Sequence, residues 1–376
     1  MKLFHTSDWH LGRMLYGRSL LDDQRYFLEQ VFLPAVEREK PDCVILSGDL
    51  YDRQIAPPEA IRLLDGIFSR LAELGCTVAA ISGNHDGADR IAIMKGALRR
   101  CGVYLSTSLS DALTPVELEA DGEHVQLFLL PYFDCAAARE FFSDEGLRGE
   151  AACMQRMLQE LERRFRPGCT HILAAHCFAA GAFTSDSEST LFVGGSGEVP
   201  PALFSAFDYV ALGHLHGPQK AGENGRYSGS PLKYSIDEER QKKSFLLLEL
   251  KGGAITETAF PVVPLHDVRR ISGGFEELLE VGAASPCEDY VELNLTDEAP
   301  VMLAAQRLRP YYPNLLAVTN NWAAATAIGG RAEKLKGQDE TTVFRTFLEE
   351  LCGTEATEED LSLFSEILEE AEAKSL

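Results

Sequence analysis

Residues 2–13 read Lys-Leu-Phe-His-Thr-Ser-Asp-Trp-His-Leu-Gly-Arg, and the rest of the fold can be worked out from this stretch. Its first residues, Lys2–Thr6, have the mostly apolar pattern of a short buried strand, and Asp8 and His10 follow directly. Residues two apart on extended backbone point to the same face of a strand. We therefore expect Asp8 and His10 to project together, and Trp9 between them to point into the core.

Further short apolar runs repeat this arrangement along the chain. Cys43–Leu46 and Thr77–Ile81 predict buried strands, and apolar residues at helical spacing over Asp22–Arg38 and Pro57–Leu74 predict helices between them. Strands that alternate with helices predict a parallel sheet covered by helices, in an α/β fold. The polar clusters that follow the expected strands are Gly48-Asp49-Leu50-Tyr51-Asp52, Gly83-Asn84-His85-Asp86, His176 and Gly213-His214-Leu215-His216.

The position of these clusters predicts a metal site. Each cluster comes where a strand is expected to end, and ligands of open α/β sheets gather at that edge. One cluster alone means little, because a glycine beside an aspartate is usually a turn. Together the clusters supply carboxylate, imidazole and amide oxygen, a mixed set that suits Mn, Fe or Zn better than magnesium or calcium.

Composition restricts the partners and the compartment. The 376 residues include 35 basic and 58 acidic ones, and the net charge of −23 argues against nucleic-acid binding by a general basic patch and against docking on anionic lipid. Nine cysteines without a Cys-x-x-Cys pair argue against a zinc ribbon or a disulfide framework. Because we find neither a signal peptide nor a membrane-length apolar run, we expect a cytoplasmic protein without membrane contact.

The chain is expected to divide into three parts. The prolines of Pro261–Pro264 exclude regular helix and predict that a first domain covers residues 1–264. Residues 265–328 have the pattern of a small α+β domain. Residues 329–376 predict a linker and two amphipathic helices, the second opened by a capping box of Thr357 and Asp360. Two such helices cannot bury both apolar stripes alone, so we expect them to bind a partner.

The order Asp-x-His, Gly-Asp-x-x-Asp, Gly-Asn-His-Asp, His, Gly-His-x-His resembles the calcineurin-like metallophosphoesterase superfamily. That resemblance implies a double β-sheet sandwich flanked by helices, with a small capping domain and a helical tail after it. The longer stretches that contain these motifs are similar to sequences of the nuclease-subunit family of SbcCD-type complexes. They are His5–Arg13, Phe207–Gln219 and Tyr227–Pro231. The likeness rests on motifs as far as residue 265 and on layout only over residues 266–325, and it fades in the tail.

The resemblance also implies roles for the site residues. Two divalent ions, manganese for activity, would share Asp49. The remaining ligands would be Asp8, His10 and His216 for one ion, and Asn84, His176 and His214 for the other. We assign His85 to the scissile phosphate as leaving-group acid or charge stabiliser, with Asp86 fixing its tautomer; a purely orienting role for His85 stays open. Arg13 and Arg53 follow their motifs and are expected to contact DNA phosphates, with plainly solvated arginines as the alternative.

The function that the resemblance implies is that of a metal-dependent nuclease in a DNA repair complex. It would act on double-stranded ends as a 3′-to-5′ exonuclease and on single strands and hairpins as an endonuclease. The implied partner is an SbcC-type SMC-like ATPase, which binds the ATP, gates the nuclease and receives the two C-terminal helices. Residues 265–328 would cap the DNA side of the site. A homodimer within a heterotetramer would use Pro57–Leu74 and Asp89–Arg100, whose apolar stripes equally suit the core.

Two other functions stay open. A phosphatase or cyclic-nucleotide phosphodiesterase would share the metal motif and suit the acidic surface. Such an enzyme, which acts on small substrates, does not need the residues after Pro264. A scaffold without catalysis is expected to lack ligands, whereas every ligand position and His85 are filled. The serines within Ser185–Ser189, Ser228 and Ser230 predict no nucleophile, because no motif places a general base beside them.

Overall fold

The structure is a computed structural model that describes residues 1–188, 197–320, 339–351 and 356–374. The chain forms two units, Met1–Val268 and Arg269–Leu376. The first unit continues a few residues past the predicted boundary at Pro264, because Lys233 Nζ lies 2.8 Å from Asp267 Oδ1 and donates to Val268 O at 3.3 Å. The predicted boundary at residue 328 and the linker after it lie outside the described residues.

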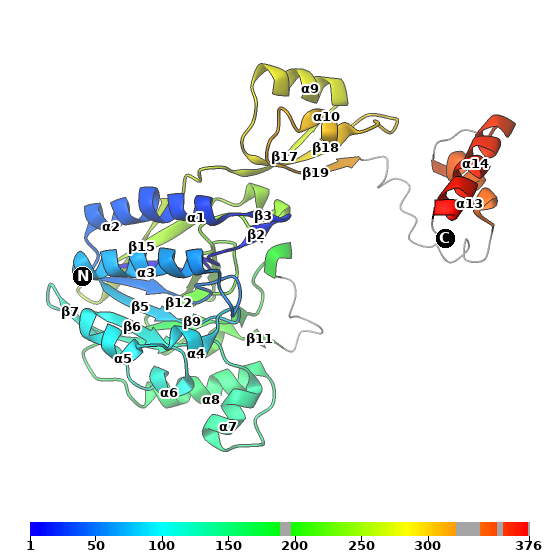
Figure 1. The fold of residues 1–376 in the computed structure, drawn as a ribbon. Coiled ribbons are helices and arrows are strands. Elements are labelled where there is room, and N and C mark those ends of the chain that lie inside the picture. The colour runs from blue at the N-terminus through cyan, green and yellow to red at the C-terminus, as the bar shows by residue number, and fades with distance from the viewer. Residues whose placement is uncertain (189–196, 321–338, 352–355, 375–376) are drawn as a thin grey trace. The chain divides into compact units, whose positions relative to one another are not determined.

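Two six-stranded sheets form the body of the first unit (Figure 1). The first sheet has the order β16-β15-β1-β4-β5-β6, and its β1, β4, β5 and β6 run parallel. Its strands are β1 (Lys2–Thr6), β4 (Cys43–Leu46), β5 (Thr77–Ile81), β6 (Val103–Ser106), β15 (Ser244–Lys251) and β16 (Ala254–Pro261).

The second sheet has the order β13-β14-β12-β9-β8-β7, with β8, β9, β12 and β14 parallel. Its strands are β7 (Val116–Ala120), β8 (Glu123–Leu130), β9 (Thr170–His176), β12 (Tyr209–Gly213), β13 (Gln219–Ala221) and β14 (Gly225–Tyr227). Short two-residue strands lie at β2 (Met14–Leu15), β3 (Arg18–Ser19), β10 (Phe178–Ala179) and β11 (Glu198–Val199).

Apolar side chains from both sheets meet in one core layer. Leu3 and Ile45 of the first sheet belong to the same buried cluster as Ile172 and Ala211 of the second. Successive residues of a strand face opposite sides, so Phe4 points the other way and packs edge-on against Phe245 with ring centroids 5.2 Å apart. Burial on both faces explains why these strands are short continuous apolar runs.

Helices cover both outer faces, which confirms the predicted sandwich (Figure 1). The outer face of the first sheet carries α1 (Leu21–Tyr26), the π-helical turn η1 (Phe27–Phe32), α2 (Leu33–Glu39) and α3 (Pro58–Glu73). The second sheet packs against α6 (Leu109–Ala112), α7 (Cys135–Phe142) and α8 (Glu150–Glu162). The remaining short elements of this unit are α4 (Ala88–Ile91), α5 (Lys95–Leu98) and the 3-10 turns η2 (Arg99–Cys101), η3 (Asp186–Glu188), η4 (Pro201–Phe204) and η5 (Ile236–Arg240).

The sequence predicted one helix over Asp22–Arg38, but the structure has two α-helices joined by the π turn. Pro34 in the first turn of α2 has no backbone N–H, so a regular ladder cannot run through it. The strands β13 and β14 were not predicted, because runs of three residues are too short for alternation to show.

The second unit contains a small α+β fold and a helix pair. Its three-stranded sheet has the order β17-β18-β19. The elements are β17 (Val268–Gly273), α9 (Phe275–Ala284), β18 (Tyr290–Leu295), α10 (Ala304–Leu308) and β19 (Leu315–Asn320), followed by α13 (Glu340–Leu351) and α14 (Glu358–Lys374). Helix α10 begins only at Ala304, because Leu303 before it has a left-handed backbone with φ 53°.

The two C-terminal helices contact each other. The rings of Phe344 in α13 and Phe364 in α14 stack with centroids 4.1 Å apart. The predicted capping box is confirmed, since Asp360 N donates to Thr357 Oγ1 at 3.2 Å and Thr357 N donates to Asp360 Oδ2 at 2.9 Å. Among the helices in the described ranges, none has the length and apolar character to cross a membrane.

Candidate metal centre

The five polar clusters meet where the carboxyl ends of the parallel strands of both sheets come together. Asp8 and His214, from different sheets, are joined by a hydrogen bond from His214 N to Asp8 Oδ1 at 3.0 Å. The sheets come so close here that a Cβ on Gly213 would lie 1.8 Å from Ser47 O. A glycine is therefore required at the end of β12.

The expectation that Asp8 and His10 lie on extended backbone is wrong. Both residues have left-handed backbone, with φ of 53° and 43°, and His214 has φ 105°. Strand β1 ends at Thr6, and the loop after it is held to the next motif by Asp8 N donating to Gly48 O at 3.1 Å and His10 N to Asp49 O at 2.9 Å. Strained conformations of this kind cluster at functional sites.

Trp9 behaves as predicted. Its side chain is buried, and its indole Nε1 donates to Thr6 Oγ1 at 2.9 Å. The ring packs edge-on against Phe32 with centroids 5.6 Å apart. Trp9 therefore anchors the ligand loop in the core.

The predicted ligand side chains form two adjoining groups. In the first, His10 Nε2 lies 3.1 Å from His216 Nε2, and one ligand atom each from Asp8, His10 and His216 falls within 4.8 Å of the others. In the second, Asn84 Oδ1 lies 2.9 Å from His176 Nε2 and 3.1 Å from His214 Nδ1.

Asp49 lies between the two groups. Its Oδ2 is 3.4 Å from His10 Nε2 in the first group and 3.4 Å from His176 Nε2 in the second. Its Oδ1 accepts the backbone N–H of His85 at 2.9 Å, which fixes the carboxylate in this position. The structure thus brings together all the residues that were predicted as ligands.

Burial and mutual charge set the protonation of these groups. Burial raises the pKa of Asp8 to about 6 and lowers the pKa of His214 to about 3 and that of His10 well below its usual range. Burial also opposes the charged forms of Asp49 and His176, but their mutual attraction prevails. It holds the pKa of Asp49 well below its usual range and raises the pKa of His176 to about 9. Buried carboxylates, imidazoles and an amide oxygen that converge in this way fit divalent transition-metal ions.

Comparison with known proteins agrees with this geometry. Residues 1–218, which carry all five clusters, match the family model described as calcineurin-like phosphoesterase. The chain belongs to the calcineurin-like phosphoesterases. Residues 264–351 of this phosphoesterase match a second model, the type 5 capsule protein repressor C-terminal domain.

Two similar proteins show to which family within the phosphoesterases the chain belongs. The D subunit of the nuclease SbcCD from Staphylococcus epidermidis is 33% identical over 351 residues, which cover 92% of each chain. The same subunit from Staphylococcus saprophyticus is 32% identical over 361 residues, 95% of each chain. The phosphoesterase therefore belongs to the family of SbcCD nuclease D subunits. Solved β-glucosidases from Exiguobacterium marinum and Micrococcus antarcticus align with TM-scores of 0.24 and 0.22 at 9% and 10% identity, values too low to bear on the fold.

The prediction that Asp86 fixes the tautomer of His85 is wrong. The His85 ring donates from Nδ1 to the carbonyl oxygen of Asp52 at 2.9 Å. The Asp86 carboxylate instead accepts three backbone N–H groups, from Leu50 at 3.1 Å, Tyr51 at 2.9 Å and Gly83 at 2.9 Å. Asp86 therefore joins the second and third motifs of the phosphoesterase, and it does not touch the His85 ring.

The two candidate phosphate contacts differ in their surroundings. Arg13 Nη1 lies 2.9 Å from Asp52 Oδ1, and Arg13 Nη2 donates to Ser187 O at 3.3 Å. Arg13 is thus not a freely solvated arginine. Arg53 is exposed.

Several residues of the site were not predicted from the sequence. Gln24 supports the ligand loop, since its Nε2 donates to His10 O at 2.8 Å and its Oε1 accepts from Gly12 N at 2.9 Å. Glu238 and Lys243 form a buried ion pair beside His216. Burial opposes the charge of Glu238, but the Lys243 ammonium holds its pKa well below its usual range. Gln24 lies in α1, where a polar residue cannot be told by sequence from one that faces solvent. Glu238 and Lys243 lie in and just after the short 3-10 turn η5, so the sequence carried no signal for them either.

Proposed function

We propose that the phosphoesterase is the nuclease subunit of an SbcCD-type DNA repair complex and hydrolyses DNA phosphodiesters with two divalent ions, manganese in preference. Its activities would be a 3′-to-5′ exonuclease on double-stranded ends and an endonuclease on single strands and hairpins. The observation that carries the proposal is the position of Asp49, whose Oδ2 lies 3.4 Å from a histidine of each ligand group.

The proposal gives each ligand group one ion. Asp8, His10 and His216 would hold the first, Asn84, His176 and His214 the second, and Asp49 would bridge them. When bound, such ions polarise the phosphate and lower the pKa of bound water toward about 7. A metal ion binds the neutral form of a histidine. Burial lowers the pKa of His10 and His214 and so favours that form, whereas His176, whose pKa Asp49 raises to about 9, would release a proton when the ion binds.

His85 would act on the scissile phosphate. The Asp52 carbonyl accepts its Nδ1–H, so the ring is held in one orientation and Nε2 is the nitrogen left for the substrate. The His85 ring lies edge-on to the His10 ring with centroids 4.8 Å apart, directly beside the first ligand group. We propose that the imidazolium form of this ring, which carries a second proton on Nε2, gives that proton to the leaving oxygen or stabilises its charge.

The direct test is cleavage of an end-labelled hairpin DNA by the full chain in Mn²⁺, with bis(p-nitrophenyl) phosphate and a cyclic nucleotide as parallel substrates. We expect the hairpin to be cut, and the cutting to stop with EDTA and to return with excess Mn²⁺. Turnover of the small esters without any DNA cleavage would instead support a small-substrate phosphodiesterase.

The partner is proposed to be an SbcC-type SMC-like ATPase that binds the ATP and gates the nuclease. The relatives are D subunits of a complex, which supports a second subunit. The net charge of −23 gives this chain little attraction for DNA, so a basic partner would supply phosphate contacts. Residues 265–328 are proposed to cap the DNA side of the site. A cytoplasmic location is proposed as well, because the eight cysteines in the described residues are free thiols.

Deletion of residues 335–376 is expected to abolish co-purification with the ATPase. The helix pair α13 and α14 leaves Leu363 and Ile367 exposed by 59% and 56%, and a partner surface would cover them. Manganese-dependent cleavage of single strands by the deleted chain is expected to persist, because the ligands lie in the first unit. Pull-down of the ATPase by the truncated chain would refute the proposal.

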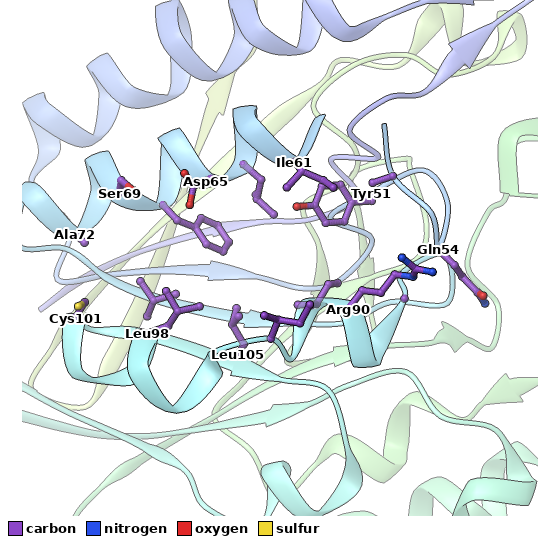
Figure 2. Close-up of a pocket in the computed structure, with 17 residues that line it drawn as sticks. Tyr51, Gln54, Ile61, Asp65, Ser69, Ala72, Arg90, Leu98, Cys101 and Leu105 are labelled. Carbon is purple, nitrogen blue, oxygen red and sulfur yellow. The ribbon is translucent and has the colours of Figure 1, made fainter. Parts of the chain in front are cut away.

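A homodimer is proposed to form through α3 and the α4–α5 segment. Their apolar stripes are partly buried and partly exposed: Leu64 and Phe68 are buried, whereas Ile61 and Met94 are 48% and 71% exposed. Between them lies an apolar pocket of about 580 Å³ (Figure 2). Figure 2 shows Ile61 on the α3 side of the pocket and Leu98 and Leu105 on the opposite side. The exposed part of the stripes is available to a second copy.

The variant Ile61→Glu is expected to convert this dimer into a monomer, measured as a halved mass in light scattering after size-exclusion chromatography. A charge at the apolar centre of an interface costs several kcal/mol unless it is paired. Val263→Glu, at a site exposed by 67% outside the pocket, is the matched control and should leave the mass unchanged. A wild-type chain that is already monomeric would contradict the proposal.

A further inference from the structure

Ser187 connects a buried carboxylate to one of the predicted metal ligands. It lies in the 3-10 turn η3, and its Oγ is 2.6 Å from His216 Nδ1 and 2.6 Å from Glu238 Oε1. Glu238 Oε1 itself is 3.6 Å from His216 Nδ1, too far for a direct hydrogen bond. The hydroxyl therefore stands between the two groups.

The direction of these hydrogen bonds follows from counting protons. Glu238 is paired with the ammonium of Lys243, so it is ionised and can only accept. A serine hydroxyl has one proton, and Ser187 donates it to Glu238. Its oxygen must then accept a proton from His216 Nδ1–H. In the neutral ring the free lone pair is then on Nε2, which lies 3.1 Å from His10 Nε2 in the ligand group.

The surroundings hold this arrangement in place. Lys243 Nζ donates to Glu238 Oε2, and also to Gln241 Oε1 at 2.7 Å, Ser230 Oγ at 2.9 Å and the backbone oxygen of His216 at 2.8 Å. The backbone N–H of His216 donates to Glu188. The backbone and the ring of His216 are thus fixed by separate partners.

We infer that Ser187 is a positioning residue that couples the charge of Glu238 to His216 and sets the Nδ1–H tautomer, so that Nε2 is presented to a metal ion. In many metal sites a carboxylate contacts the ligating histidine directly, and here a serine is interposed. The expected effect of Ser187 on metal binding rests on the proposed two-ion function, whereas the tautomer of His216 does not depend on it. The same contacts argue against Ser187 as a nucleophile, because its proton is directed to Glu238 and not to a base at the site.

The tautomer is tested in metal-free protein by long-range ¹H–¹⁵N NMR of the histidine rings, with His216 assigned from a His216→Gln spectrum. We expect the Nδ1–H pattern for His216 in the wild type, its loss in Ser187→Ala and its return in Ser187→Thr, which keeps the hydroxyl. Ser185→Ala is the matched control, since that hydroxyl donates to Glu188 at 3.3 Å and not to the ring. An unchanged His216 pattern in Ser187→Ala overturns the inference.

Isothermal titration with Mn²⁺ tests the consequence. Removing a partner that orients a ligand typically weakens metal binding by about 10- to 100-fold, and we expect this loss for one of two ions in Ser187→Ala and wild-type affinity in Ser187→Thr. Equal affinities in wild type and Ser187→Ala would overturn the coupling. A wild type that binds fewer than two ions would contradict the proposed function, while the NMR result would still decide the tautomer.

Discussion

Replacing Asp49 by asparagine is expected to lower the rate of Mn²⁺-dependent DNA cleavage by at least about 1,000-fold. Its Oδ2 is 3.4 Å from both His10 Nε2 and His176 Nε2, so the carboxylate serves both ligand groups at once. Asparagine keeps the size and tolerates the left-handed backbone at φ 50°, but it removes the negative charge. Several kcal/mol of transition-state stabilisation by the ions depends on that charge, which corresponds to a loss of this size.

The measurement compares single-turnover cleavage of hairpin DNA with Mn²⁺ titrations of the same protein. Asp89→Asn removes an exposed carboxylate just after the third motif and is the matched control. We expect the Asp49 variant to lose both cleavage and one or both ions, and the control to keep them. A rate within about tenfold of the wild type would show that Asp49 does not bridge the ions.

Replacing His85 by glutamine is expected to lower the cleavage rate by about 100- to 10,000-fold, the usual contribution of general acid–base catalysis. Manganese binding should stay unchanged, because the His85 ring bonds the Asp52 carbonyl and lies beside the ligands without belonging to them. His124→Gln, at a half-exposed histidine outside the motifs, serves as the control.

The two readouts separate the roles of His85. Loss of cleavage with normal Mn²⁺ binding supports an action on the phosphate. Loss of Mn²⁺ binding would mean that His85 supports the ligands, which is the orienting role left open by the sequence. A variant that cleaves at the wild-type rate would leave His85 without a part in the reaction.

The fold and the ligand set could be predicted because each motif directly follows a short apolar strand. Strands such as Cys43–Leu46 and Thr77–Ile81 are buried on both faces, so they appear as continuous apolar runs. Parallel strands bring their carboxyl ends to one edge, so the order of motifs was enough to place Asp8, Asp49 and Asn84 together. The same alternation predicted the helices that cover the sheet, whereas the double sandwich and the assignment of each ligand to an ion were implied by the resemblance to the calcineurin-like metallophosphoesterases.

The local geometry of the site could not be predicted in the same way. The left-handed backbone at Asp8 and His10 comes from hydrogen bonds to the next loop, which a local pattern does not show. Asp86 was assigned to its neighbour His85, whereas its carboxylate accepts N–H groups from Leu50 and Tyr51, more than 30 positions earlier.

The residues that orient the His216 ring were not predicted from the sequence, for a related reason. Ser187 and Glu238 lie on separate turns that meet only in the folded chain, 51 positions apart. Neither residue lies in a periodic element, and a serine without a recognisable motif predicts nothing by itself. Long-range hydrogen bonds between loops therefore decide the details of a site whose ligands the sequence already indicates.

Anomalous diffraction at the manganese edge, from crystals of the full chain grown with Mn²⁺, tests the two-ion centre most directly. We predict two anomalous peaks, one beside Asp8, His10 and His216 and one beside Asn84, His176 and His214, with Asp49 between them. A competing group of His10, Asp52 and His85 also brings possible ligand atoms together. A single peak, or a peak at that competing group in place of either predicted one, would contradict the two-ion centre.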